Sequence, residues 1–290
     1  EPGHRHGEVA GAMGRAGDNK PVEVGGANAG PRPMGLLAKL RTYLLAGIIV
    51  TAPISKYGLS LARIPFPGQT EMLASLCGVS SSSMMLYLGR GIAPRVPEGL
   101  AVVHVTLHTS IRSVPDLLST PKIIERIVGL HEFLLPLIGQ TPRIGVCALN
   151  PHAGEDGLFG DEERRLIAPA VEAARQQGIA VRGPLPADTL LMRACDGEFD
   201  GVVAMYHDQG LAPFKALSFG HGVNYTAGLP IVRTSPDHGT GMGIAGKNEA
   251  DPGSFRHAIW LGLDIIQNRE RWKKMSANPL QPQKKEKGGE

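Results

Sequence analysis

The stretch from Val202 to Thr234, VVAMYHDQGLAPFKALSFGHGVNYTAGLPIVRT, organises the expected fold and the expected site. It continues an apolar run, residues 201–206, that is typical of a buried strand. The run ends directly at His207 and Asp208. Open α/β sheets place their chemistry at the carboxyl ends of their strands. The stretch therefore predicts an α/β fold with a functional site where this strand ends.

Three polar residues farther along the same stretch supply groups that suit an anionic substrate. Lys215 and Arg233 offer positive charge, and Asn224 offers an amide that can orient a ligand. The structural alternative is a surface loop that carries a scattering of solvated polar groups. The two interpretations stay open at this point.

Composition describes an ordinary globular protein. The chain has 290 residues, of which 42% are hydrophobic and 20% charged, and its net charge is only +3. Much of that charge lies in residues 284–287, so we expect no nucleic-acid partner. Cys77, Cys147 and Cys195 are widely spaced and form no CxxC pair, which indicates reduced thiols in a cytoplasmic protein.

The ends of the chain carry no membrane or targeting signal. No stretch approaches the ~20 apolar residues of a membrane span. The first residues lack the charged-then-apolar order of a signal peptide. We therefore expect a cytoplasmic location and no membrane partner. Residues 1–33 are rich in Gly, Ala and Pro and are predicted to be poorly ordered, and residues 271–290 are predicted to form a disordered tail.

Apolar periodicity places strands and helices along the rest of the chain. Strands are predicted at residues 48–52, 84–88, 100–106, 143–149, 179–182 and 199–205. Helices are predicted at residues 34–46, 71–77, 114–118, 121–135, 162–177 and 254–266. A rigid turn is predicted at residues 183–188, where Gly and Pro cluster.

Three histidines share one context, because His108, His152 and His207 each follow an apolar strand. Strand exits of a parallel sheet lie along one edge, so the three imidazoles could converge there. Three neutral imidazoles with an open fourth position suit a catalytic divalent metal. Taken singly, each histidine is more often structural or a general base. His104 lies inside its apolar run and is expected to be a core histidine.

Two further residues are candidates with a plain structural alternative. Thr70 precedes the predicted helix 71–77 and could cap it, although the start of a helix also favours a phosphate. Lys56 follows the predicted strand 48–52 and is a site candidate, but a lysine there could simply solvate a loop.

Several long motifs resemble those of the 4-hydroxythreonine-4-phosphate dehydrogenase family of vitamin B6 biosynthesis. They are TAPISK at 51–56, IPFPGQTE at 64–71, NPHAGEDGLFGDEE at 150–163, GPLPADT at 183–189, the stretch 204–240 from AMYHDQG to SPDHGT, and AGKNEADPGSF at 245–255. The resemblance covers roughly residues 47–266. The motifs are long and unusual, which makes the resemblance specific.

The resemblance implies a three-layer α/β/α fold like that of isocitrate and isopropylmalate dehydrogenases, with a cleft between two domains. The first, on the cofactor side, would comprise residues 34–110 with 235–270. The second, on the metal, substrate and dimer side, would comprise residues 111–234. The family is a homodimer with its active site at the subunit interface, so a homodimer with a shared site is expected.

The resemblance also assigns roles to particular residues. His108, His152 and His207 match the metal-ligand histidines, which come from both subunits. Matches to substrate-binding positions are Gln69, Thr70, Lys215, Asn224 and Arg233, with Thr70 on the phosphate side. The loop with Gly239, Thr240 and Gly243 matches the one that cradles the adenosine half of the nicotinamide cofactor.

The implied reaction is the oxidation and decarboxylation of 4-phosphohydroxy-L-threonine to 3-amino-2-oxopropyl phosphate, in pyridoxal phosphate biosynthesis. It would use NAD, or NADP, and a divalent metal such as zinc, magnesium or cobalt. Lys215 and Asp208 are the catalytic candidates. Lys215 as a plain clamp for phosphate or carboxylate is the alternative.

Two departures from the family pattern widen the range of functions. Gln69 stands where the family has histidine, and glutamine cannot carry a proton or a charge. The family's N-terminal GDPAGIGPE segment is absent, so the first domain is expected to be shortened. The alternatives are a paralogous dehydrogenase of another phosphorylated hydroxy acid or of a dihydrodiol carboxylate, and a truncated binding protein without activity.

Overall fold

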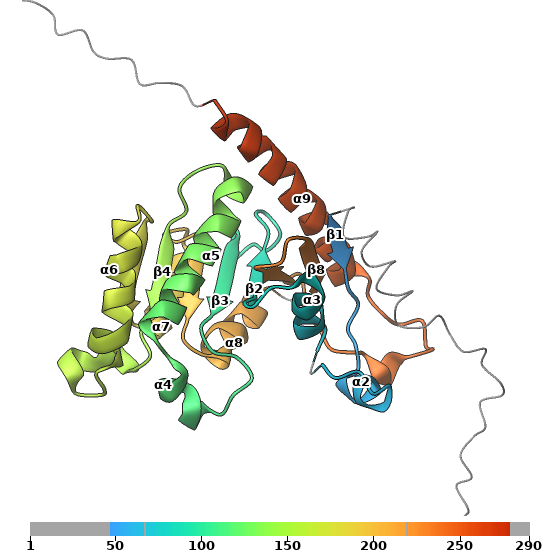
Figure 1. Ribbon diagram of the computed structural model, residues 1–290, viewed down its shortest axis with the longest axis horizontal. Coiled ribbons are helices and arrows are strands. Elements are labelled where there is room, and N and C mark those ends of the chain that lie inside the picture. The colour runs from blue at the N-terminus through green and yellow to red at the C-terminus, as the bar shows by residue number, and fades with distance from the viewer. Residues whose placement is uncertain (1–46, 67, 219, 279–290) are drawn as a thin grey trace, which may run out of the picture.

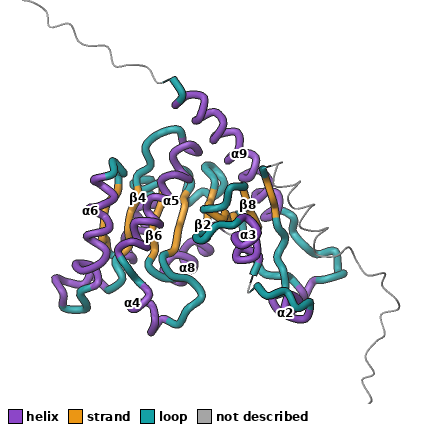
Figure 2. The backbone as a smooth tube through the Cα atoms, viewed as in Figure 1, coloured by secondary structure: helices purple, strands orange, loops and turns teal. Residues whose placement is uncertain are grey.

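One mixed sheet of eight strands forms the centre of the molecule, with helices on both of its faces (Figure 1). The computed structural model describes residues 47–66, 68–218 and 220–278. The predicted segment 1–33 and the predicted helix 34–46 lie outside these residues, as does most of the predicted tail 271–290. The smooth tube of Figure 2 shows the strands as a layer between the helices.

The strands are β1 Ile48–Val50, β2 Ser83–Leu88, β3 Leu100–His104, β4 Ile144–Cys147, β5 Val181–Leu185, β6 Gly201–Ala204, β7 Val223–Ala227 and β8 Val232–Pro236. The helices are α2 Lys56–Leu61, α3 Gln69–Cys77, α4 Val114–Leu117, α5 Thr120–Ile138, α6 Ala168–Gln176, α7 Ala187–Cys195, α8 His207–Ser218 and α9 Gly253–Ser276. Four short helical turns are η1 Ile111–Ser113, η2 Pro151–Gly157, η3 Glu163–Ile167 and η4 Met242–Ile244.

The strand order is β1-β8-β7-β2-β3-β6-β4-β5. On one side, β3, β6, β4 and β5 run parallel to one another. In the middle, β2 and β7 run antiparallel to their neighbours, and β1 is parallel to β8 at the far edge. Every residue of β3, β4 and β6 is buried, as expected of parallel strands that are covered on both faces.

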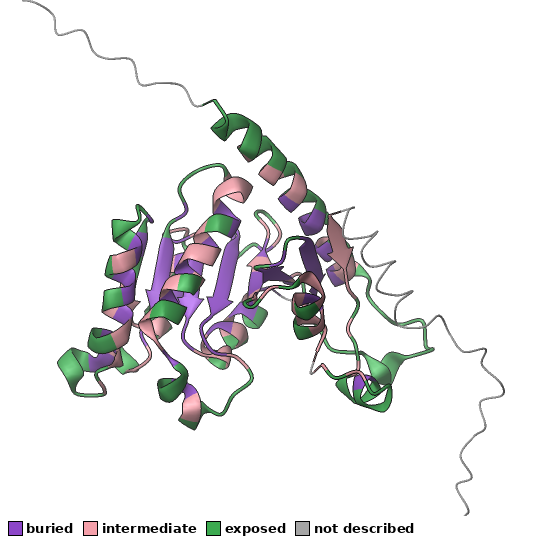
Figure 3. Cartoon of the chain, in the orientation of Figure 1, coloured by how far each residue is buried: buried purple, intermediate pink, exposed green. Residues whose placement is uncertain are grey.

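Two apolar layers hold the helices to the sheet. On one face α5, α6 and α9 pack over the strands, and Ile123, Ile127, Leu130 and Leu134 of α5 enter this layer at helical spacing. On the other face α7 and α8 pack over β2, β3, β4 and β6. Figure 3 shows the buried strands between helices whose outer faces are exposed. The predicted three-layer α/β/α architecture is therefore confirmed.

The sheet joins strands from both predicted domains, because β3 of the first region pairs with β6 of the second. The division into residues 34–110 with 235–270 and residues 111–234 stays a prediction. At the β1 edge, α3 places Leu73 against Leu229 and Ile231 in a smaller apolar cluster. No helix among the described residues is long and apolar enough to span a membrane.

Several local predictions were wrong. Thr70 does not cap α3, because the helix begins at Gln69 after Gly68 and its N-cap makes no side-chain hydrogen bond. The predicted turn 183–188 contains the second half of β5, which pairs with β4. Helix α9 continues to Ser276, so residues 271–276 are helical and not part of a disordered tail.

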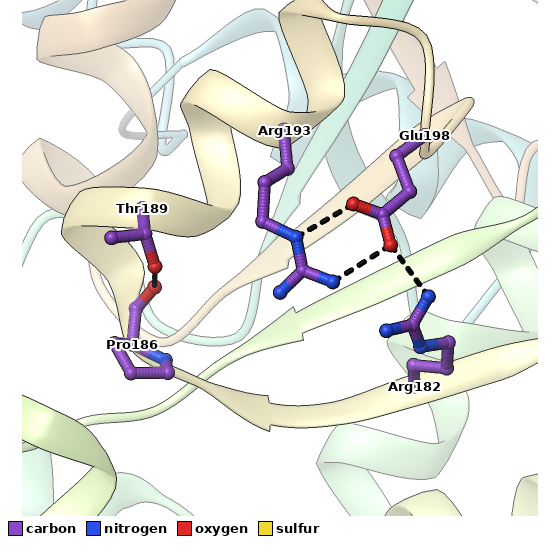
Figure 4. Close-up of polar contacts among 5 residues, drawn as sticks. All are labelled: Arg182, Pro186, Thr189, Arg193 and Glu198. Carbon is purple, nitrogen blue, oxygen red and sulfur yellow. Dashed lines mark hydrogen bonds and ion pairs between the residues drawn. The ribbon is translucent and has the colours of Figure 1, made fainter.

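A cluster of ion pairs fastens the end of α7 to β5, as Figure 4 shows. The carboxylate of Glu198 accepts hydrogen bonds from Arg193 at 2.6 and 2.7 Å and from Arg182 at 2.6 Å. The Arg193 hydrogen bond is the main reason why the pKa of Glu198 falls to about 2. At neutral pH this carboxylate is fully charged, and it links the turn before β6 to two neighbouring elements.

Candidate active site

Two of the three predicted metal-binding histidines lie together where adjacent parallel strands end. His108 follows β3, and His207 is the first residue of α8, directly after β6. Their ring centres are 5.6 Å apart. Two imidazoles that share one zinc ion at a bond length of about 2.1 Å would hold their ring centres about 5 Å apart at the tetrahedral angle. The pair therefore fits two positions of a common divalent metal.

The protonation of the pair suits metal binding. The Nδ1 of His207 lies 2.8 Å from the Oδ1 of Asp208. Because a carboxylate only accepts hydrogen bonds, Nδ1 carries the proton and Nε2 is left for a ligand. Partial burial lowers the pKa of His108, and the charges of Lys56 and His207 lower it further. A lower pKa favours the neutral imidazole that a metal requires.

His104 lies in the core, as the sequence predicts, directly behind this pair. Its ring centre is 6.3 Å from that of His207, and neither of its ring nitrogens has a hydrogen-bond partner among the described residues. Burial is the main cause that lowers the pKa of His104 to about 4. His104 is therefore neutral at physiological pH and adds no charge behind the site.

The third histidine, His152, belongs to a different neighbourhood. It is exposed on η2, after β4, and its ring centre lies 6.4 Å from that of Phe159. Among the described residues, no group of three His, Cys, Asp or Glu side chains could hold a metal ion. One chain thus brings His108 and His207 together and leaves His152 apart.

Gln209 connects the two strand ends from which His152 and His207 depart. Its side chain accepts a hydrogen bond from Met205 N at 2.7 Å and donates one to Ala148 O at 2.8 Å. Met205 follows β6 and Ala148 follows β4. Both ends of the amide bond to the backbone, so Gln209 links the two strand exits.

Arg233 is the buried cation of the site. It lies on β8 with 4% of its surface exposed. It donates to Thr51 Oγ1 at 2.7 and 3.1 Å, to Thr226 Oγ1 at 3.0 Å and to Gln69 Oε1 at 3.0 Å. Burial lowers its pKa to about 10, so it stays charged at neutral pH. Its hydrogen-bond partners among the described residues are all neutral, which leaves the charge open to an anion.

Gln69 links Arg233 to the loop after β1 by hydrogen bonds. Its Oε1 accepts from Arg233, and its Nε2 donates to Ala52 O at 3.2 Å. Thr70 lies next to it in the first turn of α3, and Glu71 follows. Glu71 is close enough to raise the pKa values of both His108 and Arg233. His108 and the buried arginine therefore lie within electrostatic range of the same carboxylate.

Lys215 and Asp237 form an ion pair that the sequence did not predict. Lys215 Nζ, on α8, is 3.7 Å from Asp237 Oδ1, just after β8. Burial raises the pKa of Asp237, while Lys215, His238 and His207 act in the opposite direction. The usable signal was the apolar run 229–232, which leads into β8, because Asp237 directly follows that strand as the histidines follow theirs.

Asn224 and the glycine-rich loop complete the predicted set. Asn224 is half-buried on β7, and its Oδ1 is buried without a hydrogen-bond partner among the described residues. Gly239, Thr240 and Gly243 lie on an exposed segment that follows Asp237, and a Cβ atom at either glycine would meet nothing within 4 Å. The loop therefore offers open backbone next to the charged groups.

Comparison with known proteins identifies the family. The family model described as pyridoxal phosphate biosynthetic protein PdxA matches residues 40–262. The chain is 50% identical over 225 residues to the 4-hydroxythreonine-4-phosphate dehydrogenase of Desulfosudis oleivorans, covering 76% of this chain and 64% of that protein. It is 48% identical to the D-threonate 4-phosphate dehydrogenase of Cupriavidus necator, with 76% and 64% covered.

A solved structure agrees with the sequence relatives. The crystal structure of 4-hydroxythreonine-4-phosphate dehydrogenase from Klebsiella pneumoniae superposes with a TM-score of 0.70 at 44% identity, covering 80% of this chain and 68% of that one. The chain spans just under two thirds of the length of the two relatives named above. The predicted resemblance is confirmed, and the chain belongs to the pyridoxal phosphate biosynthetic protein PdxA family.

Proposed function

We propose that this chain carries the active site of a metal- and NAD-dependent dehydrogenase that oxidises and decarboxylates a phosphorylated hydroxy acid. The main candidate substrate is 4-phosphohydroxy-L-threonine, with 3-amino-2-oxopropyl phosphate as the product. The observation that carries the proposal is the His108–His207 pair at 5.6 Å, together with the buried cation Arg233, which shares with His108 the electrostatic influence of Glu71. A dehydrogenase relative at 50% identity supports the reaction class.

Four polar residues of the site would bind the substrate. Arg233 provides a preorganised guanidinium for a carboxylate or phosphate, because its neutral partners hold it without cancelling its charge. Lys215 adds an exposed ammonium, and Thr70 a hydroxyl at the start of α3. The buried Oδ1 of Asn224 would accept a hydrogen bond from a substrate ammonium or hydroxyl.

His108 and His207 would hold a divalent metal, Zn²⁺, Mg²⁺ or Co²⁺, together with His152 of a second copy. A metal in that position supplies Lewis-acid polarisation of a substrate oxygen. Asp208 keeps the Nδ1 proton of His207 in place, so that Nε2 can coordinate. His152 lies on an exposed segment next to Leu158 and Phe159, which are 73% and 48% exposed. These apolar side chains favour a homodimer in which each subunit lends His152 to the other.

The residues of this chain also set the proton balance of the reaction. The substrate carbinol loses a hydride to the nicotinamide of NAD and a proton from its hydroxyl group. The β-keto acid then loses carbon dioxide, and the carbon left behind takes up a proton. Lys215, held by Asp237, is our candidate for both proton transfers. The loop with Gly239, Thr240 and Gly243 would hold the adenosine half of NAD, or of NADP, and we place the enzyme in the cytoplasm.

A coupled measurement tests this function. The purified chain is incubated with NAD, 4-phosphohydroxy-L-threonine and Co²⁺, Zn²⁺ or Mg²⁺, and NADH absorbance and released carbon dioxide are recorded. We expect equal amounts of both products and their loss after chelation of the metal. Absence of turnover with retained substrate binding would contradict the enzyme assignment and favour a non-catalytic binding protein.

D-Threonate 4-phosphate is the second candidate substrate. It differs from the first in bearing a hydroxyl where the amino acid has an ammonium. The relative from Cupriavidus necator carries the corresponding name at 48% identity. Gln69, which contacts Arg233, is the residue that departs from the family's histidine, and it favours testing this substrate in parallel. A higher kcat/KM for D-threonate 4-phosphate would assign the chain to this second activity.

A further inference from the structure

The segment that carries His152 has an unusual backbone. All residues from His152 to Gly157 have positive φ values, between 45° and 98°. His152, Ala153, Glu155 and Asp156 are among them, and residues with a Cβ atom adopt this left-handed conformation at a cost in free energy. Such backbone persists only where the surroundings force it, and it concentrates at functional sites.

A buried carboxylate holds the chain just before this segment. Glu163 is 5% exposed, and its Oε1 accepts hydrogen bonds from Leu149 N at 2.8 Å and Asn150 N at 2.7 Å. Its Oε2 accepts from Asn150 Nδ2 at 3.0 Å. One side chain therefore holds the backbone at residues 149 and 150 through two hydrogen bonds and the side chain of Asn150 through a third.

The chain is also packed closely around this carboxylate. A Cβ atom at Gly154 would lie 2.9 Å from Glu163 Oε2, and one at Gly160 would lie 2.5 Å from Asn150 Nδ2. Glu163 itself begins the π-helical turn η3, which ends at the buried Ile167. Glu163 is therefore a buried part of the core, whereas His152, on the segment that follows its partners, is exposed.

We propose that Glu163 is a positioning residue for His152. It holds the left-handed segment in the conformation that presents the imidazole away from its own sheet, toward the metal site completed with a second copy. This inference rests on the proposed function, because it treats His152 as the third ligand. Glu163 hydrogen-bonds to Leu149 and Asn150, so it would act through the chain that leads into His152.

The test measures metal binding separately from activity. Co²⁺ is titrated calorimetrically into the full chain as wild type, His152→Ala and Glu163→Gln, and only the binding that His152→Ala removes is counted. The Glu163→Gln substitution keeps the size of the side chain but replaces one acceptor by a donor that faces Asn150 Nδ2. We expect Glu163→Gln to weaken this binding by about tenfold or more, the range seen when outer supports of metal ligands are removed.

A matched control and a second readout isolate the positioning role. Glu172→Gln removes an exposed carboxylate on α6 and should leave Co²⁺ affinity unchanged. Hydrogen exchange should become faster in Glu163→Gln at residues 149–159 and stay unchanged in β3 and β6. Wild-type Co²⁺ affinity in folded Glu163→Gln would overturn the proposal, as would an increase in exchange across the whole chain.

Two outcomes separate this proposal from the function on which it rests. If His152→Ala binds Co²⁺ as the wild type does, the assigned ligand set is wrong, whatever Glu163→Gln does. If His152→Ala loses the metal while Glu163→Gln keeps it, only the positioning role fails. Should Glu163→Gln not fold, Glu163→Asp decides, because it keeps the carboxylate but shortens its reach to Leu149 and Asn150. Weakened Co²⁺ binding in Glu163→Asp supports the proposal, and unchanged binding overturns it.

Discussion

Arg233 is a buried cation that is held by two threonines and a glutamine. Burying this charge is costly, and the lowered pKa of about 10 reflects that cost, although the nearby carboxylate of Glu71 acts in the opposite direction. In the proposed function, an anionic group of the substrate would offset more of this cost on binding.

We expect Arg233→Lys to raise KM for the phosphorylated substrate by about tenfold or more, equivalent to about 1.4 kcal/mol. Lysine keeps the charge, but it cannot donate in the fixed fork that reaches Thr51, Thr226 and Gln69 together. Steady-state kinetics at saturating NAD measure the change. An unchanged KM would show that the guanidinium does not contact the substrate.

Gln69→His should alter substrate preference and make it pH-dependent. The glutamine amide accepts from Arg233 and donates to Ala52 O, and neutral histidine can do both only as one tautomer. Protonation below about pH 6.5 removes the acceptor and places a second cation beside Arg233. The kcat/KM ratio for the two phosphorylated substrates should therefore shift, and kcat/KM of the variant should fall more steeply than wild type at acidic pH. Identical pH profiles would contradict this role of position 69.

Glu198→Gln should lower stability at neutral pH and not at strongly acidic pH. The folded-state pKa of Glu198 is about 2, below the unfolded value of about 4.3, so its stabilising effect is complete above the unfolded value. It is lost as pH falls toward 2, where the wild type also protonates. Melting temperatures between pH 7 and pH 2 should converge as pH falls, and added salt should reduce the difference at pH 7. Parallel curves would contradict the ion-pair explanation.

At the scale of elements, α5 supports the face of the sheet away from α7 and α8. Ile127→Ala should destabilise the fold by about 2–5 kcal/mol, because the side chain is fully buried between α5 and the sheet. Met192→Ala, which removes a 65% exposed side chain of α7, should change stability by less than about 0.5 kcal/mol. Chemical denaturation of both variants measures the contrast. Equal effects would show that burial does not determine the contribution.

The sequence predicts those helices and strands in which apolar residues recur at the spacing of that element. Helix α5 and strands β3, β4 and β6 carry apolar residues at the spacing of buried elements. Helix α8 was not predicted, because Gly210 and Pro213 are poor helix residues. Its Gly210 is required by packing, since a Cβ atom there would lie 2.5 Å from His104 Nε2. Tertiary contact overrides local propensity at this point.

The same limit applies to the site. Because parallel strands end at one edge of a sheet, the sequence predicted that His108 and His207 lie close together, as the structure shows. It did not predict the position of His152, which lies apart on the left-handed segment after β4, although β4 is the neighbour of β6. The end of a strand can be predicted from the sequence. The path of the loop that follows depends on tertiary contacts, such as the hydrogen bonds of Glu163 to Leu149 and Asn150, which a sequence pattern does not show.

For the molecule as a whole, mixing two inactive variants should restore activity. In the proposed homodimer, His108→Ala and His152→Ala would each break both sites. In a mixed dimer one site combines intact His108 and His207 from one subunit with intact His152 from the other. Random pairing should therefore recover roughly a quarter of wild-type activity. Mixing His108→Ala with His207→Ala is the control and should recover none, because both residues belong to the same half-site. No recovery in the first mixture would contradict the shared site.

The bonds between Arg233 and Thr51 join residues 182 positions apart, and β1 finds its pairing partner only in β8. During synthesis on the ribosome, β1 must wait for β8, which is made after every other described strand of the sheet. Pairings between such distant residues slow folding, because a long loop has to close before the contact forms. We therefore expect the hydrogen-bonded setting of Arg233, and with it the proposed anion site, to form late in the folding of this sheet.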